Sequence, residues 1–127
     1  MPNLLDTHAL IWYLTGDASL TIRAKQLIEA VDAENFVSIA SLWEIAIKVQ
    51  LGKLELNGPY EMIGQQLEKN GFFILPIALE DTQLVSKLPL HHRDPFDRIL
   101  IAQAINQKLT ILTKDQFFCE YDAVVAW

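Results

Sequence analysis

The chain has 127 residues, of which 51% are hydrophobic and 20% are charged, and its net charge at pH 7 is −6. This length suits one domain over residues 1–127, which can bury roughly two thirds of its unfolded surface. The acidic balance argues against a protein that coats nucleic acid generally, because such proteins carry a basic stripe. It allows an enzyme that holds a divalent cation in an acidic cleft, where the ion reverses the local charge.

The composition also bears on the compartment. The first residues, MPNLLDTH, contain neither the basic nor the apolar region of a secretory signal, and no apolar run approaches the ~20 residues of a membrane span. Cys119 is the only cysteine and cannot form an internal disulfide, so we expect it to be a small core residue. These features predict a cytoplasmic protein without membrane contact.

Five short apolar runs have the length of buried strands, and helical patterns lie between them. The expected strands are Asn3–Leu5, Phe36–Ile39, Phe72–Ile77, Thr110–Leu112 and Ala123–Trp127. The expected helices are residues 7–14, 20–31, 41–51, 59–70, 79–87 and 95–108. Strands that alternate with helices predict an α/β protein, here an α/β/α sandwich of Rossmann-like type around a mainly parallel sheet.

The stretch LPLHHRDPFDRILIAQA, residues 88–104, places two acids at the start of an apolar helix. Asp94 is a good N-cap and Pro95 suits the first helical position, so helix initiation alone explains this pair. Asp97 falls on the apolar stripe of that helix, whereas Gln103 is expected on the opposite side. A carboxylate on a buried stripe requires a metal, a cation or several donors as partners.

Three further acids follow expected strands or begin expected helices. Asp6 directly follows the first strand, and Glu44 lies in the first turn of the helix after the second. Asp115 follows the strand at 110–112 after two residues. The turn that carries Asp97 reaches the same edge, because its helix must run antiparallel to that strand. All four acids are therefore expected at the carboxyl edge of the sheet, where open α/β sheets build their sites.

Each of these acids also has a purely structural interpretation. Asp6 and Asp115 can cap the segments that follow them. Glu44 can complete a capping box with Ser41, and it can pair with Lys48 four residues later. The joint pattern is more specific than any single member, since it combines two acids at strand ends with two at helix starts.

The set offers hard oxygen ligands with no His or Cys among them, which suits Mg²⁺ or Mn²⁺ rather than Zn²⁺. The substrate expected for such a site is a phosphodiester. The metal would acidify a water, polarise the phosphate and stabilise the leaving oxygen, with a carboxylate available as general base.

At these residues the chain resembles the PIN-domain nucleases, and most closely the VapC-like ribonuclease toxins of type II toxin–antitoxin systems. The resemblance runs from LLDTHALIW through SLWEIAIK and RDPFDRILIAQA to LTKDQFF. It implies an α/β/α sandwich and cleavage of single-stranded RNA that depends on Mg²⁺ or Mn²⁺. It also implies a homodimer and a cognate antitoxin that occludes the site.

By position, the resemblance implies four acids that are both catalytic and metal-binding, namely Asp6, Glu44, Asp97 and Asp115. It leaves open whether Asp94 touches the metal through water or only caps its helix. Thr7 either supports the site through its hydroxyl or simply begins a helix. His92, Arg93 and Arg98 either bind phosphate or are solvated loop charges, and we expect the second role for the histidine.

Two other functions compete with a nuclease. One is an inactive member of the same fold that serves as an interaction module. The other is a phosphorelay receiver domain, which requires adjacent acids after the first strand, where this chain has Thr7 after Asp6. The apolar stretches LIWYL and LWEIAI, with Trp12 and Trp43, indicate either a surface for a second copy and an antitoxin helix or ordinary core packing.

Overall fold

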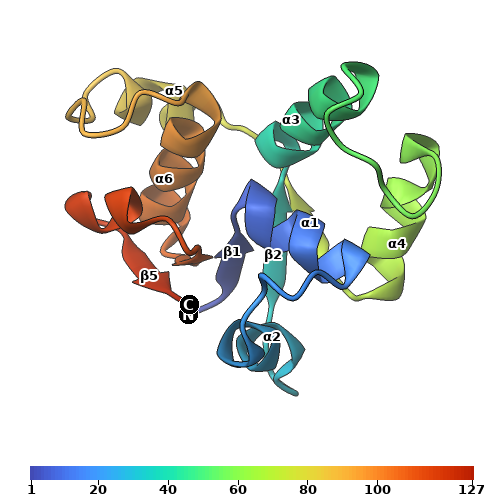
Figure 1. Cartoon of the computed structure of the whole chain (residues 1–127). Coiled ribbons are helices and arrows are strands. Elements are labelled where there is room, and N and C mark those ends of the chain that lie inside the picture. Colours follow the sequence, from blue (N-terminus) through green and yellow to red (C-terminus); the bar gives the residue numbers. More distant parts are fainter.

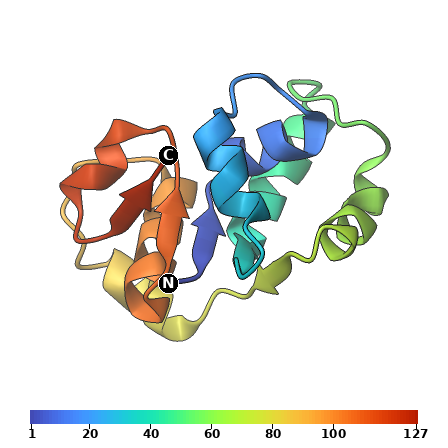
Figure 2. The same ribbon diagram turned by 90° about the horizontal axis from the view of Figure 1, so that it is seen from below.

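A five-stranded sheet, with every neighbouring pair parallel, forms the centre of the computed structural model, which describes residues 1–127 (Figure 1). Its strands are β1 (Asn3–Leu5), β2 (Asn35–Ser38), β3 (Phe73–Leu75), β4 (Thr110–Leu112) and β5 (Val124–Ala126). They lie in the order β3-β2-β1-β4-β5. The chain therefore crosses from one half of the sheet to the other after β3, and Figure 2 shows β1 between the two halves. This arrangement confirms the predicted α/β class.

Six α-helices and two short 3₁₀ segments connect the strands. They are α1 (Thr7–Thr15), α2 (Ile22–Glu29), α3 (Ile39–Gln50), η1 (Tyr60–Met62), α4 (Ile63–Lys69), α5 (Leu79–Val85), α6 (Pro95–Gln107) and η2 (Gln116–Glu120). None of the helices has the length and apolar character needed to cross a membrane. Every predicted strand and helix is present, although the helix expected at 59–70 begins as η1 and η2 was not predicted. The other differences lie at the ends of the elements.

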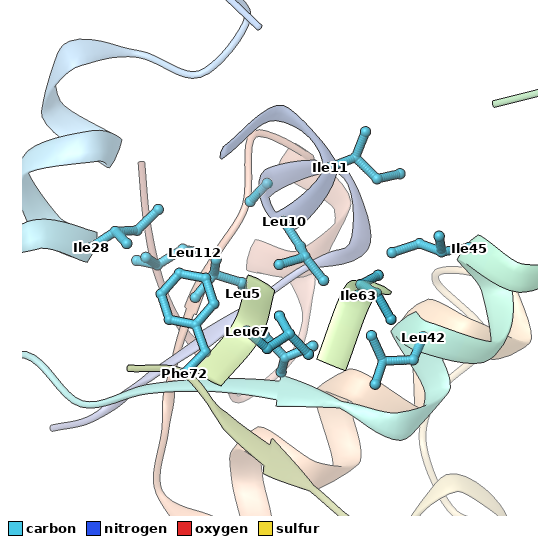
Figure 3. Close-up of a cluster of buried hydrophobic side chains, with 12 residues drawn as sticks. Leu5, Leu10, Ile11, Ile28, Leu42, Ile45, Ile63, Leu67, Phe72 and Leu112 are labelled. Atoms are coloured by element: carbon cyan, nitrogen blue, oxygen red, sulfur yellow. The ribbon is translucent and has the colours of Figure 1, made fainter. Parts of the chain in front are cut away.

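The core consists of two hydrophobic clusters, one on each face of the sheet. Leu5 and Leu112 point toward α1, α2, α3 and α4, as Figure 3 shows. Leu4 and Ile111, their neighbours in the same strands, pack instead against α6 and η2. Successive residues of a strand face opposite sides, so these short strands are buried on both faces. The result is the α/β/α sandwich that the sequence predicted.

Helix α6 is buried more completely than its apolar stripe suggests. Gln103, expected on the far side, is fully buried, and its Nε2 donates to the carbonyl oxygen of Pro76 at 3.1 Å. The expectation was wrong because α5 packs along the side of α6 that the sheet leaves open (Figure 1). Periodicity identified one buried face of this helix, but the fold covers two.

Two other local expectations were also wrong. Helix α3 begins earlier than predicted, because Ser38 at the end of β2 is its N-cap and accepts from the backbone N–H of Ala40 at 3.0 Å. Ser41 therefore lies inside the helix and forms no capping box with Glu44. Cys119 is exposed rather than in the core, since Phe118 is the residue of η2 that turns inward.

Candidate active site

Asp6 is buried at the point where β1 passes into α1. Its Oδ1 accepts from the backbone N–H of Ala9 at 2.7 Å, so Asp6 is the N-cap of α1. Its Oδ2 accepts from the hydroxyl of Thr113 at 2.6 Å. The capping interpretation is thus confirmed, and the second carboxylate oxygen remains directed toward the end of β4.

Asp115 is held beside Asp6 by the same threonine. Thr113 Oγ1 accepts from the backbone N–H of Asp115 at 3.0 Å, while Asp115 Oδ1 accepts from the N–H of Phe117 at 2.9 Å and caps η2. Sequence reasoning missed Thr113. Its only local signal was a polar residue directly after a buried strand.

The start of α6 brings two more carboxylates to this edge. Asp94 Oδ1 accepts from the N–H groups of Phe96 at 2.9 Å and Asp97 at 3.1 Å, so Asp94 is the N-cap of α6. Asp97 is half-buried, and its Oδ2 lies 2.7 Å from Nε2 of His92. The predicted cap is confirmed, and Asp97 faces the other acids.

His92 is the functional candidate that the sequence assigned wrongly. Its side chain is only 19% exposed, and its Nε2 lies 3.4 Å from Asp115 Oδ2 in addition to its contact with Asp97. The ligand atoms of His92, Asp97 and Asp115 all lie within 4.8 Å of one another. A solvated loop charge was expected because nothing in the local sequence says how the loop before α6 folds back.

Arg98 determines the path of the loop before α6. Its Nη1 donates to the carbonyl oxygens of Pro89 at 2.8 Å and His92 at 3.2 Å. Its Nη2 donates to those of Val85 at 2.9 Å and Leu88 at 3.2 Å. Arg98 is buried, so neither phosphate binding nor free solvation describes it; it holds residues 85–92 against α6. Arg93, by contrast, is exposed.

Glu44 approaches the site from α3. Its side chain is 12% exposed, and its Oε2 lies 3.4 Å from Nζ of Lys48, which confirms the predicted i,i+4 pair. Its Oε1 is buried and has no hydrogen-bond partner. Thr7, the first residue of α1, donates to Ser41 Oγ at 3.0 Å and so joins α1 to α3 near this position.

A hollow of about 270 Å³ opens beside the acids, lined by Asp6, His8, Trp12, Lys114 and Asp115. Two carboxylates and two basic side chains thus share one small space. A larger hollow of about 500 Å³ lies between α1, α2 and α4, and none of the four predicted acids lines it. Because two of the four acids, Asp6 and Asp115, line the smaller hollow, it is the better candidate site.

The comparisons with known proteins identify the family of the chain. Residues 4–124 match the sequence model of the PIN domain. The chain belongs to the PIN-domain family. It is 32% identical over 116 residues to ribonuclease VapC22 of Mycobacterium tuberculosis, covering 89% of this chain and 86% of that protein.

Two solved structures share the PIN-domain fold of this chain. A toxin–antitoxin complex from Klebsiella pneumoniae superposes with a TM-score of 0.68 at 22% identity, covering 98% of this chain and 96% of the other. VapBC2 from Rickettsia felis, bound to a promoter DNA fragment, superposes with a TM-score of 0.73 at 14% identity, covering 99% and 98%. At these identities the likeness establishes the fold.

The acids of this PIN domain influence one another's ionisation. The pKa of Asp97 is raised to about 7, first by burial and then by the charge of Asp94, while His92 opposes the rise. The charges of Glu44 and Asp6 also raise the pKa of Asp97. Burial likewise raises the pKa of Asp6, against the hydrogen bond from Thr113. Carboxylates that repel one another in a buried place are stabilised either by taking up a proton or by binding a cation.

The donor set fits a divalent cation. Asp6, Glu44, Asp97 and Asp115 supply carboxylate oxygens from four different elements of the fold, and the buried Oε1 of Glu44 lacks any protein partner. An orphaned buried oxygen is unfavourable unless a ligand satisfies it. Oxygen ligands of this kind suit Mg²⁺ or Mn²⁺.

Proposed function

We propose that this PIN-domain protein is a metal-dependent endoribonuclease that cleaves single-stranded RNA as the toxin of a toxin–antitoxin pair. The observation that carries the proposal is the convergence of Asp6, Glu44, Asp97 and Asp115 at one sheet edge, where Asp97 responds to the charges of its neighbours. Family membership and the similarity to a protein named ribonuclease VapC22 support the nuclease activity.

In this proposal the four acids hold Mg²⁺ or Mn²⁺. A bound cation of this type acidifies a water and stabilises negative charge on the scissile phosphate and the leaving oxygen. Thr113 and the N–H of Ala9 orient Asp6, and the N–H of Phe117 orients Asp115. A carboxylate oxygen of the cluster that is not coordinated accepts the proton of the attacking water.

The basic side chains at the hollow have a separate task. His8 and Lys114 line the same hollow as Asp6 and Asp115, and both are exposed. A cationic side chain at the rim of an acidic site attracts the phosphates on either side of the cleaved bond. Because the net charge of the chain is −6, local cations of this kind offset part of its repulsion from RNA.

The proposed partners are a second copy of the chain and an antitoxin. Trp43 is 62% exposed and packs edge-on against Phe96, with ring centroids 5.3 Å apart. These two aromatic residues directly precede Glu44 and Asp97, so a protein that covered Trp43 would also restrict access to the acids. The structural relatives that are toxin–antitoxin complexes support such a partner.

The homodimer is tested by light scattering of the purified chain, which is expected to give a dimer. A monomer at micromolar concentration would reject the homodimer.

The test of the activity uses purified chain free of antitoxin and a varied pool of single-stranded RNA. We expect cleavage with Mg²⁺ or Mn²⁺, none in EDTA, and poor cleavage of duplex DNA. Asp97→Asn should abolish cleavage, whereas Asp32→Asn, an exposed acid near the opposite edge of the sheet, should not. No cleavage by a chain whose metal binding is demonstrated would favour an inactive interaction module instead.

A further inference from the structure

The backbone of His92 is fixed on both sides. Its N–H donates to Oη of Tyr121 at 2.8 Å, and its carbonyl oxygen accepts from Arg98 at 3.2 Å. Tyr121 Oη in turn donates to the carbonyl oxygen of Pro89 at 2.9 Å. Tyr121 and Arg98 are themselves buried, so these contacts give the loop before α6 one defined path. The position of His92 is therefore built into the fold.

The imidazole ring is also constrained. Its centroid lies 5.8 Å from that of Phe117 and 6.0 Å from that of Phe118, and both aromatic residues belong to η2. This packing directs Nε2 toward the acids, 2.7 Å from Asp97 Oδ2 and 3.4 Å from Asp115 Oδ2. Few rotamers satisfy both the aromatic contacts and the backbone anchors.

The contact between His92 and Asp97 is close, but it is not a hydrogen bond. Nε2 is buried and has no hydrogen-bond partner, although Asp97 Oδ2 lies only 2.7 Å away. A buried ring nitrogen between two carboxylates, without a hydrogen bond, is poorly explained by packing alone. The same arrangement is expected of a nitrogen that shares a cation with those carboxylates.

We propose that Nε2 of His92 is a nitrogen ligand of the divalent cation held by Asp97 and Asp115, and that this ligand makes the site prefer Mn²⁺ to Mg²⁺. The inference rests on the proposed metal-dependent function and adds a ligand outside the all-oxygen set. Adjacent ligand atoms of an octahedral ion lie about 3 Å apart. Nε2 of His92 lies 2.7 Å from Asp97 Oδ2 and 3.4 Å from Asp115 Oδ2, on either side of that value.

The preference follows from ligand chemistry. Mg²⁺ is a hard ion that takes oxygen ligands and retains several waters, whereas imidazole nitrogen binds transition-metal ions. One nitrogen among oxygens therefore stabilises bound Mn²⁺ more than bound Mg²⁺. It should favour Co²⁺ still more, following the order of affinities of divalent first-row metals.

The other two histidines provide matched controls. His91, the preceding residue, has a side chain that is 44% exposed, and its Nδ1 lies 3.7 Å from Glu120. His8 lines the hollow together with Asp6 and Asp115, but it does not belong to the group of His92, Asp97 and Asp115 whose ligand atoms lie within 4.8 Å of one another. Only His92 is assigned as a ligand.

The first measurement is pulsed EPR of Mn²⁺ bound to the full chain, which detects ¹⁴N coupled to the ion. We expect nitrogen coupling in the wild type and its loss in His92→Gln, whose side-chain oxygen reaches about as far as Nε2. His91→Gln and His8→Gln should retain the coupling. Thermal melts without metal establish that all three variants are folded.

The second measurement is competitive binding of Mn²⁺ and Mg²⁺ without RNA. His92→Gln should weaken Mn²⁺ binding at least about tenfold and change Mg²⁺ binding much less, so the preference falls. Absence of nitrogen coupling in the wild type, or its persistence in His92→Gln, would overturn the proposal. If Mn²⁺ nevertheless binds through Asp97 and RNA is cleaved, the proposed function stands; if Mn²⁺ does not bind at all, both fall.

Discussion

Thr113 donates a 2.6 Å hydrogen bond to Oδ2 of Asp6, so a hydroxyl at the end of β4 fixes the acid at the end of β1. The two strands are neighbours in the sheet, although the two residues are 107 positions apart in the chain. The same hydroxyl oxygen accepts from the N–H of Asp115. One side chain therefore sets the positions of two acids of the site.

Thr113→Val tests this relationship, because valine has nearly the same shape and no hydroxyl. We expect metal affinity to fall by roughly 10- to 100-fold, as for loss of other groups that orient metal ligands. The unpaired N–H of Asp115 should cost about 1–2 kcal/mol of stability. Thr113→Ser should restore both properties. Isothermal titration with Mn²⁺ and thermal melts give the two readings, and wild-type affinity in the valine variant would contradict the assignment.

The raised pKa of Asp97 predicts how the metal-free protein depends on pH. The folded state holds this proton up to a pH of about 7, whereas the unfolded chain releases it near its ordinary value of 3.8. The resulting stabilisation is complete below about pH 4 and is lost as the pH rises through about 7.

In EDTA, the melting temperature should therefore fall between about pH 5 and pH 8. The shift in the pKa of Asp97 corresponds to a change of roughly 4 kcal/mol at most in the free energy of unfolding. Because Asp97 is partly exposed, we expect a change of about 1–2 kcal/mol. Asp97→Asn should flatten this dependence, because asparagine does not titrate. The exposed Asp32→Asn serves as the control. Equal slopes for wild type and Asp97→Asn would show that the carboxyl ionises normally in the folded state.

Substitution of the two acids in RDPFD separates capping from metal binding. Asn caps a helix about as well as Asp, so Asp94→Asn should change stability by less than about 0.5 kcal/mol. With Mn²⁺ at a hundredfold excess over Kd, the wild type should gain about 2.7 kcal/mol. Asp94→Asn should keep this gain and Asp97→Asn should lose most of it. Thermal melts with EDTA and with Mn²⁺ measure this gain in each variant. If Asp94→Asn loses the gain and Asp97→Asn keeps it, Asp94 is the ligand.

Arg98 should prove to be a structural residue. Arg98→Met removes four hydrogen bonds to partly buried carbonyl groups, although Tyr121 still donates to that of Pro89. The loss should cost on the order of 3 kcal/mol and lower Tm by roughly 10 °C. Arg98→Lys should recover only part of this loss, since lysine lacks the planar fork. The exposed Arg93→Met should change stability by less than about 0.5 kcal/mol. Equal melting temperatures for the two methionine variants would contradict the role assigned to Arg98.

Some properties of this protein follow from its sequence without a structure. The alternation of short apolar runs with helical patterns predicted a parallel α/β sheet, because strands buried on both faces need helices between them. Parallel strands end at one edge, so Asp6 and Asp115 were expected there together, with Glu44 and Asp97 at the starts of flanking helices. These inferences depend on periodicity and chain direction, which are local properties.

Other properties depended on tertiary structure. His92 faces Asp97 because Arg98 and Tyr121 hold its loop, and Thr113 reaches Asp6 because β4 pairs with β1. Gln103 is buried because α5 covers a second side of α6. Each of these outcomes requires contacts between separate segments, whereas a helical or strand pattern records only which side of its own element is apolar. The partners of a polar side chain are therefore decided by how the elements pack.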